Sequence, residues 1–143
     1  MTRKLSDREY ERLLEFRTAV RRFLAWSRSQ AANAGIAPTQ HQLLLAIRGH
    51  RDHSRGPTIG ETAEYLLLKP NSVVELVDRA SAAGLVERVP DGTDQRVVRL
   101  RLTPTGESKL NSISAATLDQ LDEMAPHLQA VQRVLGTDGD ERS

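Results

Sequence analysis

Residues 70–102 read PNSVVELVDRASAAGLVERVPDGTDQRVVRLRL, and this stretch decides the fold class. In its first part, apolar residues recur at the three- and four-residue spacing of a helix with one buried face: Val73, Leu76, Val77 and Ala80. Pro70 suits a first helical turn and Gly84 suits the position just after a last one. The pattern therefore predicts a helix from Pro70 to about residue 83.

After Gly84 the spacing of apolar residues changes to two. Residues 85–89 (LVERV) are typical of a strand, and in residues 98–102 (VRLRL) apolar residues alternate with arginine, as in a half-buried strand. The polar residues 90–95 between them form a turn, and Pro104 ends the second strand. We therefore expect a two-stranded hairpin directly after the helix.

Two shorter helices are expected before this segment. Thr58 caps a helix that runs to Leu67, and the following helix begins at Pro70 after a tight turn. Pro38 and Thr39 open an earlier helix, for which Thr39 and Gln42 have the spacing of a capping box. The predicted fold is mainly α with a small β-hairpin wing, the arrangement of a winged helix-turn-helix.

Long helices flank this lobe on both sides. The first begins at a capping box of Ser6 and Glu9 and runs to about Ala34. The last covers about residues 105–135, with Pro126 predicting a kink or a division into two helices. We therefore divide the chain into an N-terminal dimerisation helix (1–37), a DNA-binding lobe (38–104), C-terminal dimerisation helices (105–136) and a flexible tail (137–143).

Both flanking helices have apolar stripes that one small chain cannot cover, because only 38% of the residues are hydrophobic and 3% aromatic. The segments also differ in charge. Residues 1–37 have eight Lys/Arg and four Asp/Glu, whereas residues 107–143 have three and seven. We expect a homodimer with an interface at Tyr10, Leu13, Leu121, Met124, Leu128 and Val131.

A recognition helix inserts its N-terminal residues into the major groove, where Lys, Asn, Ser and Glu side chains can bind base edges. An arginine on a protruding hairpin suits the narrow minor groove, and a nearby carboxylate can hold it through charge-assisted hydrogen bonds. A helix N-terminus can bind phosphate. The expected DNA-binding residues are Thr58, Lys69, Asn71, Ser72, Glu75, Asp94 and Arg96. Phosphate contact by Arg99 and Arg101, on the outer face of the strand, stays open.

The chain resembles the MarR family of bacterial regulators over about residues 8–135. The matching segments occur in the family's order: LVDR (76–79), AGLVER (83–88), DGTDQR (91–96) and LTPTG (102–106). The resemblance implies an obligate dimer in which the N- and C-terminal helices of both chains intertwine. It also implies binding to pseudo-palindromic DNA, in most cases as a repressor. Lys69, Asn71, Ser72, Glu75, Asp94 and Arg96 fall on the family's DNA-contact positions. Val74-Glu75 departs from the Thr-Arg of many members, so base preference cannot be transferred.

The resemblance also implies control by a small effector, often an aromatic anion. Phe23, Trp26 and His41 are candidates for an effector pocket, although packing explains them equally well. No cofactor is expected. His50 and His53 lie near Asp52 and His41 with a spacing that fits no common zinc signature, so a solvated loop is the preferred interpretation.

Three function classes remain to be compared. The preferred class is a dimeric transcriptional regulator, and the alternative is a winged-helix module that binds protein, which the net charge of +1 and Glu75 favour slightly. An enzyme is disfavoured because the chain has no cysteine, no glycine-rich phosphate loop and no carboxylate pair on a rigid element. The charged N-terminus and the lack of a long apolar run predict a cytoplasmic protein that does not enter the membrane.

Overall fold

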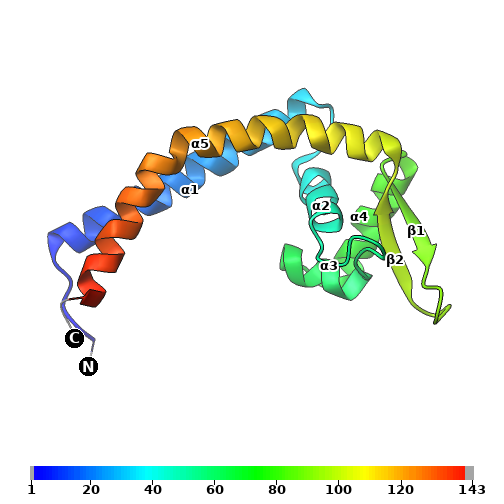
Figure 1. Ribbon diagram of the computed structural model, residues 1–143, viewed down its shortest axis with the longest axis horizontal. Helices are drawn as coiled ribbons and strands as arrows, with labels where there is room; N and C mark the ends of the chain where they lie inside the picture. Colours follow the sequence, from blue (N-terminus) through cyan, green and yellow to red (C-terminus); the bar gives the residue numbers. More distant parts are fainter. Residues whose placement is uncertain (1, 141–143) are drawn as a thin grey trace. The chain divides into compact units, whose positions relative to one another are not determined.

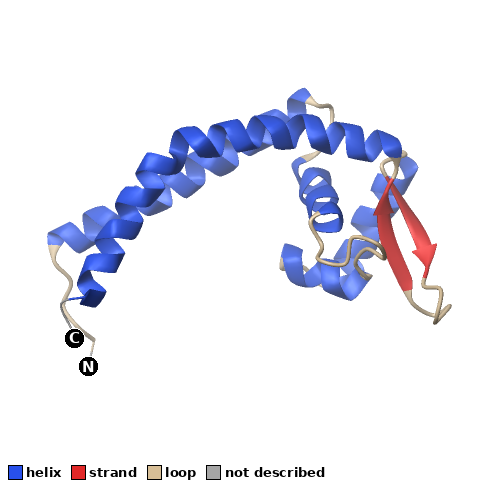
Figure 2. Cartoon of the chain, viewed as in Figure 1, coloured by secondary structure: helices blue, strands red, loops and turns tan. Residues whose placement is uncertain are grey.

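The computed structural model describes residues 2–140, with side chains described for residues 2–126, Gln129 and Gln132. The helices and strands (Figure 1) follow in the order α1 (Asp7–Asn33), α2 (Pro38–Arg48), α3 (Ile59–Leu66), α4 (Pro70–Ala82), β1 (Val86–Pro90), β2 (Val98–Leu102) and α5 (Pro104–Asp140). Figure 2 shows a helical chain with one small antiparallel hairpin, so the predicted fold class is confirmed. Within the described residues, none of the helices is both long and apolar enough to cross a membrane.

The chain divides into two compact units. The terminal unit contains residues 1–29 and 115–143, and the lobe contains residues 30–114. The division falls inside α1 and α5, and not at residues 37 and 104 where the sequence suggested boundaries. The reason is that the end of α1 and the start of α5 belong to the core of the lobe, where Ala31, Leu110 and Ile113 are buried.

The core of the lobe joins α2, α3, α4 and the hairpin. The side chains of Leu43, Leu44, Val73, Val77 and Leu100 are fully buried in it. All four apolar positions read from the sequence of α4 face this core. Burying each such side chain contributes about 1.5–3 kcal/mol, so the helix-turn-helix is held by its own packing.

The hairpin has the register expected for one apolar and one polar face. Val86 pairs with Leu102 and Arg88 with Leu100, and Pro90 pairs with Val98 at the far end. Leu100 and Leu102 are buried, whereas Arg101 between them is exposed. Figure 1 shows the two strands leaving the lobe beside α4 and ending in a loop. The hairpin therefore presents residues 91–97 at its tip.

Several helix ends follow the predicted local chemistry. The amide of Ser6 donates to the carboxylate of Glu9 (2.7 Å) and the amide of Glu9 donates to Ser6 Oγ (3.2 Å), which confirms the first capping box. Gly84 has a φ of 76°, the left-handed conformation that glycine adopts without strain after a helix.

One local prediction was wrong, and one alternative of another is excluded. The N-cap of α2 is Ala37, whose amide donates to Gln40 Oε1 (3.3 Å), so Thr39 and Gln42 lie inside the helix and do not cap it. Helix α5 is one continuous helix through Pro126, so it is not divided into two helices, and a kink at Pro126 stays a prediction. A proline removes one amide donor, and a single missing hydrogen bond does not end a helix of 37 residues. Residues 137–140, expected in the tail, continue α5, and residues 141–143 lie outside the described part.

Candidate nucleic-acid interface

Helix α3 begins at a closed capping box. Thr58 Oγ1 accepts from the amide of Glu61, and the Glu61 carboxylate accepts from the amide of Thr58, both at 3.1 Å. The predicted cap is therefore confirmed. These bonds use the amide of Thr58 and one acceptor position of its hydroxyl, so the hydroxyl hydrogen and the other amides of the first turn of α3 remain for a phosphate.

The turn between α3 and α4 is one residue longer than the sequence indicated, because α3 ends at Leu66. Leu67 follows α3 as its C-cap in a left-handed conformation (φ 55°), and its side chain is 91% exposed. The amide of Leu68 then donates to the carbonyl of Ala63 (3.1 Å). Lys69 is extended and precedes Pro70, the first residue of α4. This geometry brings Lys69 to the start of the second helix of the motif.

Helix α4 separates a buried face from an exposed one. Its exposed face carries Asn71, Val74, Glu75 and Asp78, at helical spacings of three and four. Ser72 is partly buried beside them. Glu75 makes no ion pair within the described part of the chain, so the alternative of a pair with Arg79 is not realised. The start of α4 thus offers an ammonium, an amide, a hydroxyl and a carboxylate to a partner.

Asp78 has a role that the sequence reading missed. Its Oδ1 lies 2.5 Å from Nη2 of Arg88, so an ion pair joins the exposed face of α4 to β1. The two residues are only ten apart, but they belong to different elements, and helical periodicity gives no signal for such a pair. The carboxylate of Asp78 is therefore neutralised by the wing, whereas that of Glu75 is not.

Asp94 organises the backbone at the tip of the hairpin. Asp94 Oδ1 accepts from the backbone amide of Arg96 (2.9 Å), and the carbonyl of Asp94 accepts from the amide of Val97 (3.1 Å). Asp94 thus holds the backbone of Arg96, and not its guanidinium as the sequence suggested, because an aspartate readily binds the amide two residues on. Arg96 is exposed, and its guanidinium forms no ion pair with any described residue.

Arg99 differs from the expectation of an outward, solvated arginine. Its side chain is only 18% exposed and lies near the carboxylates of Glu61 and Asp91. The loop before α3 covers this face of the hairpin, and Thr58 forms an isolated β-bridge with Arg99. Direct phosphate contact by Arg99 is therefore disfavoured, while Arg101 remains exposed.

The three described histidine side chains, those of His41, His50 and His53, belong to no candidate metal site. No group of three or more His, Cys, Asp or Glu among the described side chains could hold a metal ion. His53 is exposed, but His50 is buried and lies 2.9 Å from the Tyr65 hydroxyl, so the interpretation of a wholly solvated loop was wrong for His50. A buried ring that contacts Tyr65 through Nδ1 and Glu61 through Nε2 is a structural element of the lobe.

The candidate effector residues lie in different units. Phe23 and Trp26 belong to the terminal unit, where their rings stack at a centroid distance of 6.3 Å. His41 belongs to the lobe and is buried, and this desolvation lowers the pKa of its imidazole. The structure brings the two aromatic rings together, and membership of an effector pocket stays a prediction.

The expected interface residues lie on α1 and α5. Tyr10, Leu13 and Leu121 are exposed and Met124 is partly buried, whereas the side chains of Leu128 and Val131 lie outside the described residues. Tyr10, Leu13 and Leu121 are among the large hydrophobic residues of the terminal unit that are more than a third exposed. The others are Leu14, Phe16, Val20, Leu24 and Leu118.

A lobe with a helix-turn-helix, an exposed N-terminal half of α4 and a hairpin wing defines a winged helix-turn-helix protein. Residues 34–97 match the model of the MarR family. The lobe of the chain therefore matches the MarR family of winged-helix transcriptional regulators. Proteins of this family are regulators of transcription and not enzymes, as the sequence predicted.

Two curated relatives come from Bacillus subtilis. The chain is 37% identical over 67 residues to the uncharacterized HTH-type transcriptional regulator YsmB, covering 47% of this chain and 46% of YsmB. It is 30% identical over 81 residues to the HTH-type transcriptional repressor MdtR, covering 57% of this chain and 50% of MdtR. The matched region therefore spans about half the length of these relatives.

Solved structures share the fold over nearly the whole chain. A MarR family protein from Bacillus stearothermophilus has a TM-score of 0.73 at 24% identity, covering 96% of this chain and 98% of that one. A point mutant of MepR from S. aureus, bound to an oligodeoxyribonucleotide, has a TM-score of 0.63 at 16% identity, covering 98% of this chain and 100% of that one. At these identities the likeness establishes the fold.

Proposed function

We propose that this chain is a homodimeric transcriptional regulator that binds double-stranded DNA through α4 and the wing. The observation that supports the proposal is that one lobe exposes two elements suited to contact DNA bases. The first turns of α4 present Lys69 and Asn71, and the wing tip presents the unpaired guanidinium of Arg96. MepR, a protein of the same fold, has been solved with an oligodeoxyribonucleotide, which supports this use of the lobe.

In this proposal, Asn71, Ser72 and Glu75 contact base edges in the major groove, and Arg96 enters the adjacent minor groove beside Asp94. Lys69 and the first turn of α3 at Thr58 contact phosphates. The outer face of α4 has two carboxylates, of which only that of Glu75 is free of an ion pair. Glu75 can accept from cytosine N4, so it adds base preference and reduces attraction to phosphate.

The terminal unit supports the homodimer. Every buried apolar residue described lies between Ala31 and Ile113, so the described side chains of the terminal unit include no buried apolar residue. It instead exposes the eight large hydrophobic residues named above. Burying each of them against a partner would contribute up to about 1.5–3 kcal/mol. A second copy of the chain can bury these residues against the same residues of its own terminal unit. A two-fold interface requires such self-complementary surfaces.

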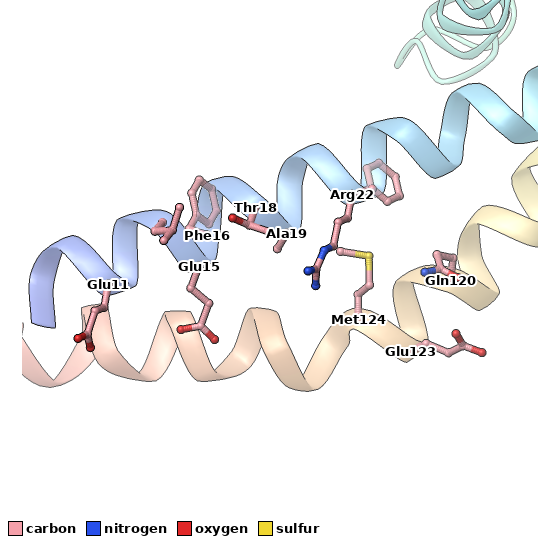
Figure 3. Close-up of a pocket in the computed structure, with 11 residues that line it drawn as sticks. Glu11, Glu15, Phe16, Thr18, Ala19, Arg22, Gln120, Glu123 and Met124 are labelled. Atoms are coloured by element: carbon pink, nitrogen blue, oxygen red, sulfur yellow. The ribbon is translucent and has the colours of Figure 1, made fainter.

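A groove of about 650 Å³ between α1 and α5 is the place where such a partner would bind. Leu14, Phe16, Phe23 and Met124 provide its apolar lining. Figure 3 shows Arg22 and Met124 reaching into the space between the two helices. Glu11, Glu15 and Glu123 add negative charge to the lining, and the basic first 37 residues of a second copy are complementary to it.

Two-fold symmetry makes the operator pseudo-palindromic. Two recognition helices then enter major grooves about 34–36 Å apart, one turn of DNA. We propose that the protein acts as a repressor, as MdtR is described to do, and that a small aromatic or anionic effector near Phe23, Trp26 and His41 releases the DNA. Such an effector shifts the equilibrium between two spacings of the dimer's DNA-binding lobes only if it binds the protein more tightly at one spacing than at the other.

The test is fluorescence anisotropy with DNA from upstream of the chain's own gene and with sites selected from random DNA, at two salt concentrations. We expect tight binding that weakens steeply with salt, and a loss of about 1–3 kcal/mol in Arg96→Ala. Arg28→Ala removes the same charge from the terminal unit and serves as the matched control. Equal binding by wild type and Arg96→Ala would contradict the proposed wing contact.

One observation favours a second function, a winged-helix module that binds protein. The exposed face of α4 carries the unpaired carboxylate of Glu75 in a chain with a net charge of +1. Such a module would select no sequence from random DNA and would retain its protein partner after Arg96→Ala. The selection experiment therefore separates the two functions.

A further inference from the structure

The side chain of Arg99 lies on the wing and contacts other parts of the lobe. Its Nη1 donates to the carbonyl oxygen of Gly56 and to Glu61 Oε1, both at 3.3 Å. Its Nη2 lies 3.6 Å from Asp91 Oδ2. The guanidinium therefore connects β2 to the loop before α3, to α3 itself and to Asp91, the residue that follows β1.

The acceptors of Arg99 are themselves held in place. Glu61 Oε1 also accepts from the amide of Thr58 as part of the α3 cap. Desolvation raises the pKa of Glu61, but hydrogen bonds from Thr58 and the neighbouring His50 and Arg99 outweigh it, so the net pKa is lowered. Asp91 is only 11% exposed, and its amide closes the hairpin by donating to the carbonyl of Val97 (2.9 Å).

His50 holds the other oxygen of Glu61. Its Nε2 lies 3.3 Å from Glu61 Oε2, and its Nδ1 lies 2.9 Å from the Tyr65 hydroxyl. The contact at Nδ1 is a hydrogen bond, whereas the contact at Nε2 is a close approach to the carboxylate. His50 is 7% exposed, whereas Tyr65 is 52% exposed and the side chain of Glu61 is 40% exposed, so the outer sides of both contacts reach water.

The backbone reinforces the same junction. The amide of Leu100 donates to the carbonyl of Pro57 (2.8 Å), which fastens β2 to the loop before α3. Gly56 passes so close to β2 that a Cβ there would overlap the carbonyl oxygen of Leu100. This backbone bond fixes the base of the wing, whereas Arg99 controls how the rest of the hairpin is directed.

We propose that Arg99 is a positioning residue for DNA binding, because its bonds to Glu61 and Asp91 set the direction of the wing and thereby the place of Arg96. This inference rests on the proposed function. Arg96 is three residues from Arg99, a separation of about 10 Å in extended chain. A change of about 10° in the direction of the hairpin would move Arg96 by roughly 2 Å, which is enough to break its hydrogen bonds in the minor groove.

The experiment is a double-mutant cycle on DNA affinity with Arg99→Lys and Arg96→Ala. Lysine keeps the positive charge but has one ammonium, which cannot bind the carboxylates of Glu61 and Asp91 as the planar guanidinium does. We expect Arg99→Lys to weaken binding about tenfold in the wild-type background and less than about twofold in the Arg96→Ala background, because the two residues act as a unit.

A purely structural role would give a different pattern. If Arg99→Lys only destabilised the lobe, the loss of affinity would be the same with and without Arg96. If Arg99 bound phosphate itself, Lys would retain most of the affinity and Arg99→Gln would reduce the salt dependence by about one phosphate contact. Either result would overturn the proposal while leaving DNA binding by wild type intact.

Arg48→Gln is the matched control. Arg48 forms an exposed ion pair with Glu107 (2.6 Å) in the same lobe and contacts neither Glu61 nor Asp91. We expect this variant to leave DNA affinity unchanged within about twofold, since exposed pairs contribute little. Amide exchange gives a readout without DNA: the Asp91 amide should exchange faster in Arg99→Lys and not in Arg48→Gln. If wild type itself selected no DNA sequence, the proposed function would fail as well.

Discussion

Gly106 lies where the first turn of α5 meets the chain that leaves α4. A Cβ at this position would overlap the carbonyl oxygen of Leu85 and lie 3.0 Å from its carbonyl carbon and 3.2 Å from its Cα. All three atoms are backbone, and Leu85 is buried, so no flexible side chain can move aside. Gly106→Ala therefore requires the start of α5 to move by about 1 Å to restore ordinary contact distances.

We expect Gly106→Ala to reduce the free energy of unfolding of the lobe by about 2–3 kcal/mol, the upper part of the usual range for overpacking. The assay is urea denaturation followed by circular dichroism, at equal protein concentration, because dimerisation changes the apparent stability. Gly92→Ala is the control, since a Cβ there has no atom within 4 Å. A Gly106→Ala protein within about 0.5 kcal/mol of Gly92→Ala would refute the reasoning.

Three further predictions concern the terminal unit and the core. Leu13→Asp places a charge on the exposed apolar face of α1 and should shift sedimentation toward monomer; an unchanged dimer would exclude Leu13 from the interface. Burial lowers the pKa of His41 below 6.5, so stability should be lost as the pH falls below that value, because the unfolded chain binds the proton more readily. His41→Gln should remove that part of the pH dependence of urea unfolding. Titration with benzoate, a simple aromatic anion, should quench Trp26 fluorescence and weaken DNA binding together; quenching with unchanged affinity would separate this site from regulation.

The sequence was informative wherever the deciding interaction is local. The capping boxes at Ser6 and Thr58 join residues three positions apart, and the structure contains both. The change of apolar spacing at Gly84 placed the boundary between helix and hairpin within one or two residues. The first residues of α4 were identified as exposed from the same pattern, because a helix with one buried face must turn its other face outward.

Local sequence patterns gave wrong predictions where two alternative interactions compete for the same residues. Thr39 and Gln42 have the spacing of a capping box, but Pro38 occupies the first helical position, and this places the cap at Ala37. Asp94 was expected to hold the side chain of Arg96, but the nearer backbone amide takes that carboxylate. In both cases the residues were correctly singled out, and the partner of each hydrogen bond was not.

The sequence by itself determined the helices of the lobe, the hairpin and the residues that the lobe exposes, because caps, turns and apolar periods depend on neighbours in the chain. Only the tertiary structure decided what Arg99 does. Its partners Glu61 and Gly56 are 38 and 43 positions away in the sequence, and no periodicity relates residues so far apart. An arginine on a strand is exposed until another segment covers it, and here the loop before α3 makes Arg99 the connection between the wing and α3.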